Sequence, residues 1–544
     1  MRVALITLFL SVAFGRLSNG SDGASGNGSL FKCRINFEDD SYENFLEATG
    51  NAKVNFTTDP HEVIEGKRSL VIDTTATKHD WHVALKSKPG VLKPGRRYMI
   101  TLRCRVEALS DSNDEFYLGI EPMTPETWVP FSTEKQLGVT KEEALPFIYE
   151  GSNDRRLVIG IRKQGRAVID SVDIEEQNRL TPAMLSAPGE KVASPLPYEP
   201  YGLCIHADRI SSTPFGYTDE LVKRALDMWK EMGVQWVRLS LGNLFHDRQS
   251  AISGLCDPKQ QARLEMLING LRERGIHFYI IDSDGKVPWY SPPKETVKPP
   301  YEPWAYPCPD SEEYRLYIEA EAKLYAKASD YWEIGNEMDW EFWAATPELY
   351  MKNLAIARAV LKKYNPNIRI IMGGLAGDGI SARLEGKDNF LQRLYDSGLK
   401  GQTDILAFHL YNSTVEKNIY HLNRSISVMT RNGDGTKPIW ITETSTAMCV
   451  PTLDWKWVVT DAAEKAQADY LRDTYTILLR HPNVEKVFWW NFKALHAGMD
   501  REAGLALTGT DLSPRPAYWE FKALPKQTEH FVNQNLLRID GLGR

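Results

Sequence analysis

Two short stretches of the sequence place a glutamate directly after an apolar run. The first, DYWEIGNEMDW at residues 330–340, ends its apolar part at Asn336 and Glu337. The second, PIWITETST at residues 438–446, does the same at Glu443. Two carboxyl groups that meet at one site can divide proton donation and nucleophilic attack between them, provided that one keeps its proton. Glu337 and Glu443 are therefore our candidate catalytic residues.

Other apolar runs also end in side chains that could bind a polar ligand. Arg238 and Tyr411 are suited to keeping a carboxylate ionised, because a nearby cation or hydrogen-bond donor favours the charged form. Together with these two, we predict that the following residues bind substrate: Asn336, His409, Trp490, His206 and Asp282. Asp208 and Asp284 end runs in the same way. The sequence leaves open whether any of these groups holds a metal.

From residue 201 the chain alternates between short apolar runs and helical patterns. Eight runs have strand character, at residues 201–208, 234–241, 276–284, 330–337, 368–376, 404–411, 438–445 and 486–492. Helical patterns separate them at residues 218–233, 258–275, 311–328, 346–365, 389–398 and 460–481. This alternation predicts an α/β fold, a (β/α)8 barrel over residues 201–525. An open, doubly wound sheet is the alternative, but the first run lacks the glycine-rich loop that such sheets usually carry.

In a parallel barrel the carboxyl ends of all strands open onto one face, so the candidate residues should converge there. Their order then resembles the large clan of retaining glycosidases with (β/α)8 barrels. In that clan an Asn-Glu pair ends strand four and a glutamate ends strand seven. An arginine, a His-x-Tyr pair and a tryptophan come from strands two, six and eight. This sequence has Asn336-Glu337, Glu443, Arg238, His409-Leu410-Tyr411 and Trp490 at those places.

The resemblance implies a retaining double displacement on a poly- or oligosaccharide. Glu443 would be the nucleophile, Glu337 the acid/base, and Asn336 would hold the sugar 2-hydroxyl. It implies no cofactor for catalysis. A non-catalytic glycan-binding protein on the same barrel is the alternative function. An esterase or metallohydrolase is disfavoured, since neither GxSxG nor HExxH occurs.

The segments before and after the barrel have different characters. Residues 1–20 resemble a cleaved signal peptide, which predicts secretion to an extracellular or periplasmic space. Residues 31–178 alternate with turn signals and predict a β-sandwich that resembles carbohydrate-binding jelly rolls. In that comparison Glu38 and Asp170 match the ligands of a structural calcium. Residues 179–200 are predicted to be a linker and residues 526–544 a C-terminal tail.

Aromatic residues outside the strand ends are candidates for stacking on sugars. In the sandwich these are Trp81, Tyr98 and Trp128, for which core packing is at least as good an interpretation. The long loop after the third barrel run adds Trp289, Tyr290, Trp304 and Tyr306. Proline-rich segments such as this loop have restricted backbone freedom and can form a shaped wall.

Composition limits the classes of partner. The 544 residues are 42% hydrophobic and 25% charged, with a net charge of −7 and no basic block. Nucleic acid is therefore not an expected partner, because phosphate binding requires clustered lysine and arginine. No run after the signal peptide is apolar enough to predict a membrane span. The six cysteines fit no metal motif, and their pairing is left open.

Overall fold

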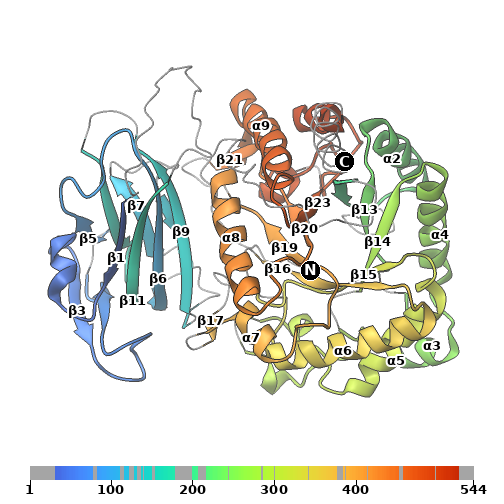
Figure 1. Ribbon diagram of the computed structural model, residues 1–544, viewed down its shortest axis with the longest axis horizontal. Coiled ribbons are helices and arrows are strands. Elements are labelled where there is room, and N and C mark those ends of the chain that lie inside the picture. The colour runs from blue at the N-terminus through green and yellow to red at the C-terminus, as the bar shows by residue number, and fades with distance from the viewer. Residues whose placement is uncertain are drawn as a thin grey trace, which may run out of the picture. The chain divides into compact units, whose positions relative to one another are not determined.

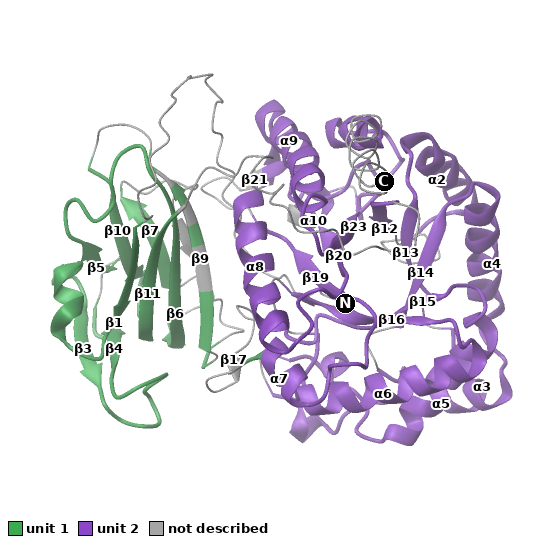
Figure 2. Ribbon diagram, in the orientation of Figure 1, with its two compact units in different colours: residues 1–181, 379–390 green, residues 182–378, 391–544 purple. Residues whose placement is uncertain are grey.

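A computed structural model of the chain describes residues 31–77, 82–110, 116–121, 128–130, 137–138, 140–149, 154–177, 199–205, 216–242, 244–282, 286–298, 301–340, 342–376, 384–385, 388–412, 414–451, 457–496 and 498–525. The predicted signal peptide, nearly all of the linker and the C-terminal tail lie outside these residues, as do Trp81, His206, Asp208 and Asp284. The chain divides into two compact units, residues 1–181 with 379–390 and residues 182–378 with 391–544 (Figure 2).

The second unit contains the predicted closed barrel of eight parallel strands (Figure 1). Its strands, in order around the barrel, are β12 (Tyr201–Cys204), β13 (Trp236–Ser240), β14 (His277–Asp282), β15 (Tyr331–Asn336), β16 (Arg369–Ala376), β19 (Leu406–Leu410), β20 (Ile439–Thr444) and β23 (Val484–Trp489). Each strand coincides with one of the eight apolar runs in the sequence. The (β/α)8 prediction is confirmed.

Helices follow the barrel strands and surround them in Figure 1. They are α2 (Asp219–Met232), α3 (Arg248–Ser253), α4 (Pro258–Glu273), α5 (Ser311–Tyr325), α6 (Pro347–Tyr364), α7 (Phe390–Asp396), α8 (Val415–Arg431), α9 (Asp461–Leu478) and α10 (Arg501–Gly504), with a last helix over residues 516–525. Several begin at a Thr or Asp whose side chain accepts a backbone N–H of the first turn, as helix caps do. None of the described helices is long and apolar enough to cross a membrane.

Large side chains fill the barrel interior. The buried cluster includes Trp236, Tyr279, Tyr331, Trp440 and Phe488. Side chains alternate between the two faces of a strand, so the residue two positions further along also points inward. On three strands this places a polar residue above an aromatic one: Arg238 follows Trp236, Glu333 follows Tyr331 and Thr442 follows Trp440.

The first unit consists of two antiparallel sheets that share one hydrophobic core, as in a β-sandwich. One sheet has the order β3 (Lys53–Thr57), β4 (Ser69–Asp73), β11 (Gly165–Gln177), β6 (Arg97–Leu109) and β9 (Thr140–Ile148), with β1 (Lys32–Asn36) also paired to β11. The other has the order β2 (Leu46–Ala48), β5 (His82–Ser87), β10 (Arg156–Ile161), β7 (Phe116–Glu121) and β8 (Trp128–Pro130).

Most of the described residues for which we considered a ligand-binding role in this unit make contacts within the unit itself. Tyr98 is buried and its hydroxyl accepts the Lys93 N–H, so of its two interpretations the structure agrees with core packing. The side chain of Trp128 lies outside the described part. Glu38 accepts the Lys67 N–H, and burial raises the pKa of Asp170 to about 6. The calcium ion stays a prediction. None of the six cysteines, all of which are described, forms a disulfide.

Asp282 is a correction to the sequence analysis. It shares the outward face of β14 with Phe278 and Ile280, whereas Tyr279 faces the barrel interior. Its fully buried carboxyl group accepts the Tyr314 hydroxyl at 2.8 Å, and together with burial it raises the pKa of Glu321 on α5. Asp282 therefore joins a strand to a helix and does not reach the barrel mouth, so its assignment to substrate binding is wrong.

Replacing Glu321 should change how stability depends on pH. Burial and the neighbouring Asp282 raise the pKa of Glu321 well above its usual range. The resulting stabilisation is complete below the unfolded pKa and is lost as pH rises toward the folded pKa. Glu321→Gln keeps a neutral hydrogen-bond donor, so its stability relative to wild type should grow between pH 5 and pH 8, by at most about 1.4 kcal/mol per pH unit.

Urea unfolding of the barrel at the two pH values measures this difference. Glu312→Gln on the same helix is the matched control, because Glu312 is exposed and pairs only with surface groups such as Arg315. Parallel pH dependence in the two variants would contradict a raised pKa of Glu321.

Candidate active site

A buried guanidinium group organises the site. Arg238 lies two positions after Trp236 on β13 and so faces the barrel interior. Its Nε and Nη2 atoms donate to Glu333 at 2.8 and 3.1 Å, and Nη2 also donates to Asn336 at 2.8 Å. Its Nη1 atom donates to Glu443. Burial alone would lower the pKa of Arg238, but the two carboxylates outweigh that effect and hold its pKa above the usual range.

Glu443 is held in the ionised state by three groups. One carboxylate oxygen accepts from Arg238, and the other accepts the Tyr411 hydroxyl. His409 Nδ1 lies 3.6 Å from the second oxygen. Burial opposes ionisation, but His409, Arg238 and Tyr411 together lower the pKa of Glu443 below its usual value. A buried carboxylate with that many partners is suited to act as a nucleophile.

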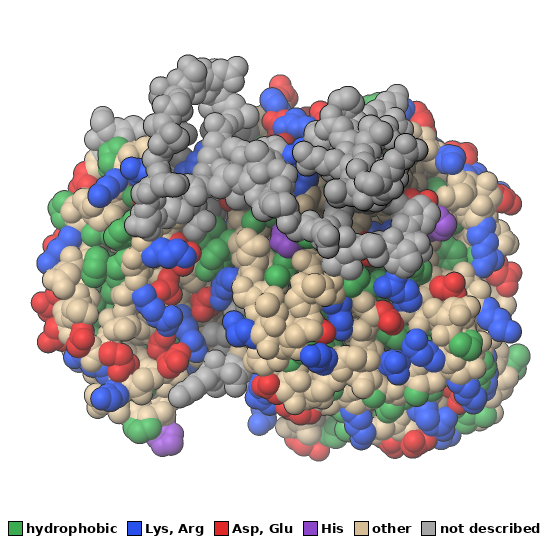
Figure 3. Space-filling view, viewed as in Figure 1, with side chains coloured by type: hydrophobic (Ala, Val, Ile, Leu, Met, Phe, Trp, Pro, Cys, Tyr) green, Lys and Arg blue, Asp and Glu red, His purple; other side chains and the backbone are tan. Residues whose placement is uncertain are grey.

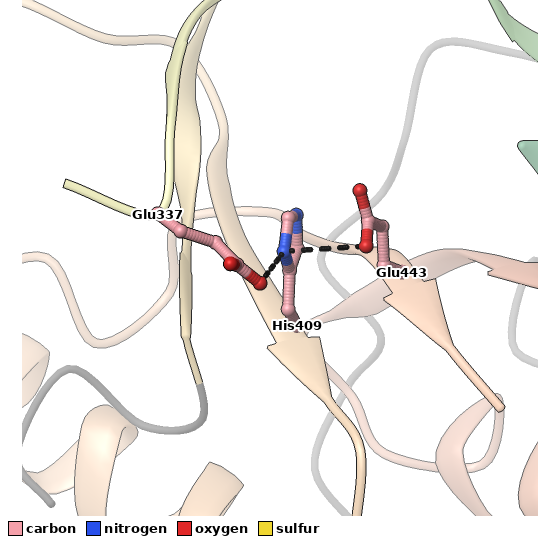
Figure 4. Close-up of side chains that lie close together, drawn as sticks. All are labelled: Glu337, His409 and Glu443. Atoms are coloured by element: carbon pink, nitrogen blue, oxygen red, sulfur yellow. Dashed lines mark hydrogen bonds and ion pairs between the residues drawn. The ribbon is translucent and has the colours of Figure 1, made fainter. Parts of the chain in front are cut away.

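His409 lies between the two candidate catalytic glutamates (Figure 4). Its Nδ1 atom is 2.8 Å from a Glu337 oxygen, and the imidazole is fully buried. Burial alone would lower the pKa of His409, but Glu443 and Glu337 reverse the effect and raise it. The imidazole fits only because residue 374 is glycine, since a Cβ there would lie 2.1 Å from His409 Nε2.

The backbone around Glu337 has an uncommon conformation. Gly335 and Glu337 have φ angles of 87° and 46°, both in the left-handed region. A non-glycine residue there costs roughly 1–2 kcal/mol, so other contacts must stabilise it. The Glu337 N–H donates to the Gly374 carbonyl at 2.8 Å, and the Glu337 carbonyl accepts from Trp340. These bonds fix the direction in which the Glu337 side chain leaves the strand end.

Tyr411 and Trp490 complete the wall of the site. Their rings meet edge to face, with centroids 6.4 Å apart. Trp490 is partly buried and packs against a small cluster made of Ala447, Cys449 and Leu505. The exposed part of the Trp490 ring therefore lies beside Tyr411, whose hydroxyl donates to Glu443. A tryptophan in this position could stack on a sugar.

The structure brings together most of the predicted site residues. Hydrogen bonds and a ring contact connect seven of them at the carboxyl-terminal side of the barrel: Arg238, Asn336, Glu337, His409, Tyr411, Glu443 and Trp490. His206 falls outside the described residues, and Asp282 faces α5. In the long loop, Trp289 donates to Glu313 and Tyr306 accepts from Lys298, so both support the loop itself. Trp304 remains 48% exposed.

Sequence reasoning missed two acidic residues of the site. Glu333 is fully buried and binds both Arg238 and the Gly374 N–H. Its place two positions after the inward-facing Tyr331 was the signal that could have found it. Asp339 is also fully buried, accepts the Ala376 N–H at 2.8 Å, and has its pKa raised well above the usual range by burial. No spacing rule in the sequence indicated its burial.

Three residues of the site, Glu337, His409 and Glu443, are of the types that can bind a metal ion. Ligand atoms of Glu337, His409 and Glu443 lie within 4.8 Å of one another. Each oxygen of Glu443, however, already accepts a hydrogen bond, and one of the donors is the Arg238 cation. A second cation would be repelled by that guanidinium group. The arrangement therefore fits a charge-compensated pair of carboxyl groups better than a metal site.

The surface charge pattern gives no separate indication of a polyanionic ligand. Acidic and basic side chains are interspersed over the described part of the face shown in Figure 3. A nucleic-acid site would concentrate lysine and arginine on one face or along one groove. The expectation that nucleic acid is not a partner stays a prediction.

Comparisons with solved structures give low similarities. A glucosidase from Croceicoccus marinus is 16% identical, with a TM-score of 0.46 over 60% of this chain and 67% of that one. A family 39 glycoside hydrolase from Bacteroides cellulosilyticus is 15% identical, with a TM-score of 0.44 over 81% and 79%. The endo-1,4-β-D-xylanase 10B of Clostridium thermocellum is 12% identical, with a TM-score of 0.40 over 90% and 96%.

No curated protein matches the chain. One family model does, and its match runs through the barrel from the start of α6 to the segment before the last helix. It includes His409, Tyr411, Glu443 and Trp490 and begins just after Glu337. Residues 345–514 match the family model described as the glycosyl hydrolase catalytic core.

Proposed function

We propose that the protein is a secreted glycoside hydrolase that cleaves O-glycosidic bonds in a poly- or oligosaccharide with retention of configuration. The observation that carries the proposal is the separation of the two carboxyl groups, because an oxygen of Glu337 lies within 4.8 Å of one of Glu443. Retaining enzymes hold their carboxyl groups roughly 5–5.5 Å apart, whereas inverting enzymes leave roughly 6.5–9.5 Å for a water molecule.

In the first step Glu443 attacks the anomeric carbon while Glu337 protonates the departing oxygen. The bond from the anomeric carbon to that oxygen breaks, and a bond to the Glu443 carboxylate forms. Arg238 and Tyr411 keep Glu443 ionised before the attack. In the second step Glu337 removes a proton from water, the water attacks the same carbon, and Glu443 leaves.

The remaining site residues orient the sugar and the acid. Asn336 Oδ1 accepts from Arg238, so the orientation of the amide is fixed, and its nitrogen can be directed at the sugar 2-hydroxyl. His409 bridges the two carboxyl groups, which holds Glu337 in place, and both carboxyl groups raise the pKa of the imidazole. Trp490 supplies an aromatic surface at the same subsite.

Substitution of each glutamate should produce a different defect. Glu443→Gln should lower kcat/KM by roughly a thousandfold or more while the fold is kept, because no covalent intermediate can form. Glu337→Ala should retain activity on a dinitrophenyl glycoside, whose leaving group needs no proton. Azide should accelerate that variant, because it attacks the glycosyl-enzyme without general-base help.

These rates are measured by release of the nitrophenolate, with Glu312→Gln as a surface control that should behave as wild type. Near-normal turnover by Glu443→Gln would remove the assignment. A wild type that hydrolyses no glycoside would instead favour the non-catalytic glycan-binding alternative.

The first product should carry the anomeric configuration of the substrate. Two displacements at the same carbon restore the original configuration, and a carboxyl separation within 4.8 Å is shorter than the roughly 6.5–9.5 Å that inverting enzymes leave for water. Proton NMR, recorded before mutarotation, identifies the first anomer. Initial formation of the opposite anomer would exclude the double displacement.

The acidic limb of the kcat/KM profile should depend on Tyr411. Glu443 must be ionised to attack, so activity falls as pH drops through its lowered pKa. Tyr411→Phe removes one of the groups that lower this pKa, and the limb should move to higher pH. Tyr364→Phe is the control. The Tyr364 hydroxyl also donates to a carboxylate, but that carboxylate belongs to Glu319 on α5, outside the site. An unchanged acidic limb in Tyr411→Phe would show that another group controls it.

A further inference from the structure

An exposed aromatic pair lies in the loops beside the candidate acid/base. Trp304 belongs to a short 3-10 turn, η4 (Pro303–Ala305), and is 48% exposed. The ring of the half-buried Phe342 lies 5.5 Å from it, tilted by 54°. Lys286 Nζ is 5.0 Å from the Trp304 ring centroid. Two aromatic rings and an ammonium group therefore meet at the surface of the barrel unit.

This pair is on the same face of the barrel as Glu337. Trp304 lies in the loop from β14 to α5, and Phe342 in the loop from β15 to α6, and such loops cover the carboxyl ends of the strands. The Ala344 N–H donates to the Ala305 carbonyl at 2.9 Å and joins the two loops. Phe342 is only five positions after Glu337 in the chain, which limits their distance to roughly 18 Å even for an extended chain.

Hydrogen-bonded turns shorten that distance further. The Trp340 N–H donates to the Glu337 carbonyl at 2.9 Å, and the Trp343 N–H donates to the Trp340 carbonyl at 3.3 Å. Glu337 and Trp340, and Trp340 and Trp343, are thus each held close together.

The strand order places the pair opposite the candidate nucleophile. Around the eight-stranded barrel, β14 and β20 are four strands apart in either direction. Glu443 at the end of β20 and the loop that carries Trp304 therefore lie across the barrel mouth from each other. In a displacement the nucleophile and the leaving group occupy opposite sides of the anomeric carbon, so the leaving group departs toward Glu337 and the aromatic pair.

We infer that Trp304 and Phe342 form a subsite for a sugar ring of the leaving group. The apolar C–H face of a pyranose would pack on the exposed indole, and Lys286 would donate to its hydroxyl groups. The substrate is then a chain with at least one sugar on the leaving-group side of the scissile bond. This inference rests on the proposed function and specifies the substrate of the same site.

The test compares leaving groups in Trp304→Ala. A panel of 4-nitrophenyl glycosides of glucose, xylose, mannose and galactose identifies the sugar that the wild type releases. kcat/KM is then measured for that nitrophenyl glycoside and for the tetrasaccharide of the same sugar. We expect a loss of about tenfold or more on the tetrasaccharide, as for a truncated aromatic anchor, and less than about twofold on the nitrophenyl glycoside.

Trp519→Ala is the matched control. Trp519 is 54% exposed, and Lys522 Nζ lies 5.2 Å from its ring, but it is on the last helix outside the barrel mouth. Trp519→Ala should leave kcat/KM unchanged on both the nitrophenyl glycoside and the tetrasaccharide. Trp304→Phe should recover part of the tetrasaccharide activity, because a smaller ring can still stack.

Two results would overturn the subsite. One is an unchanged kcat/KM of Trp304→Ala on the tetrasaccharide, and the other is an equal loss on both substrates, which would indicate general damage to the site. A wild type that cleaves no member of the panel and no tetrasaccharide would instead reject the proposed function, and the subsite with it.

Discussion

The site depends on one buried cation. The Arg238 guanidinium group is 7% exposed and lies between the carboxylates of Glu333 and Glu443, with Asn336 as a third acceptor. A charge in this position is tolerated only when it is paired, and removing one partner of a buried pair typically costs about 3–5 kcal/mol. The aromatic cluster in the barrel interior holds the strand of Arg238 in place. The planar guanidinium group of Arg238 then fixes the carboxylate of Glu443, which we assign as the nucleophile.

Charge balance connects this pair to the rest of the site. Three carboxyl groups, Glu333, Glu337 and Glu443, meet two groups that can be cationic, Arg238 and His409. The five groups are neutral together when one carboxyl group keeps its proton, which is the state that acid catalysis requires. Gly374 makes this arrangement sterically possible, because any side chain there would displace the imidazole that bridges the two glutamates.

Much of the barrel was predictable because its signals are local. All eight strands are apolar runs of the sequence, and most helices carry a cap and an apolar face. The helix α8 was missed although its sequence is amphipathic, and its buried face carries the polar residues Lys417, Asn418, His421 and Ser425 beside the apolar ones. The carboxylates Glu337 and Glu443 were also found locally, from the abrupt change from apolar residues to a charge.

The sequence by itself determined which residues end the strands and the order in which they do so. Only the tertiary structure decided which way each side chain points. Asp282 follows the alternation of β14 and faces α5, whereas Glu443 faces inward directly after the inward-facing Thr442. The strand register shifts between Phe408 and His409 and again between Ile441 and Thr444, and such irregularities re-aim side chains. These shifts arise from pairing with neighbouring strands, so they leave no mark in the local sequence.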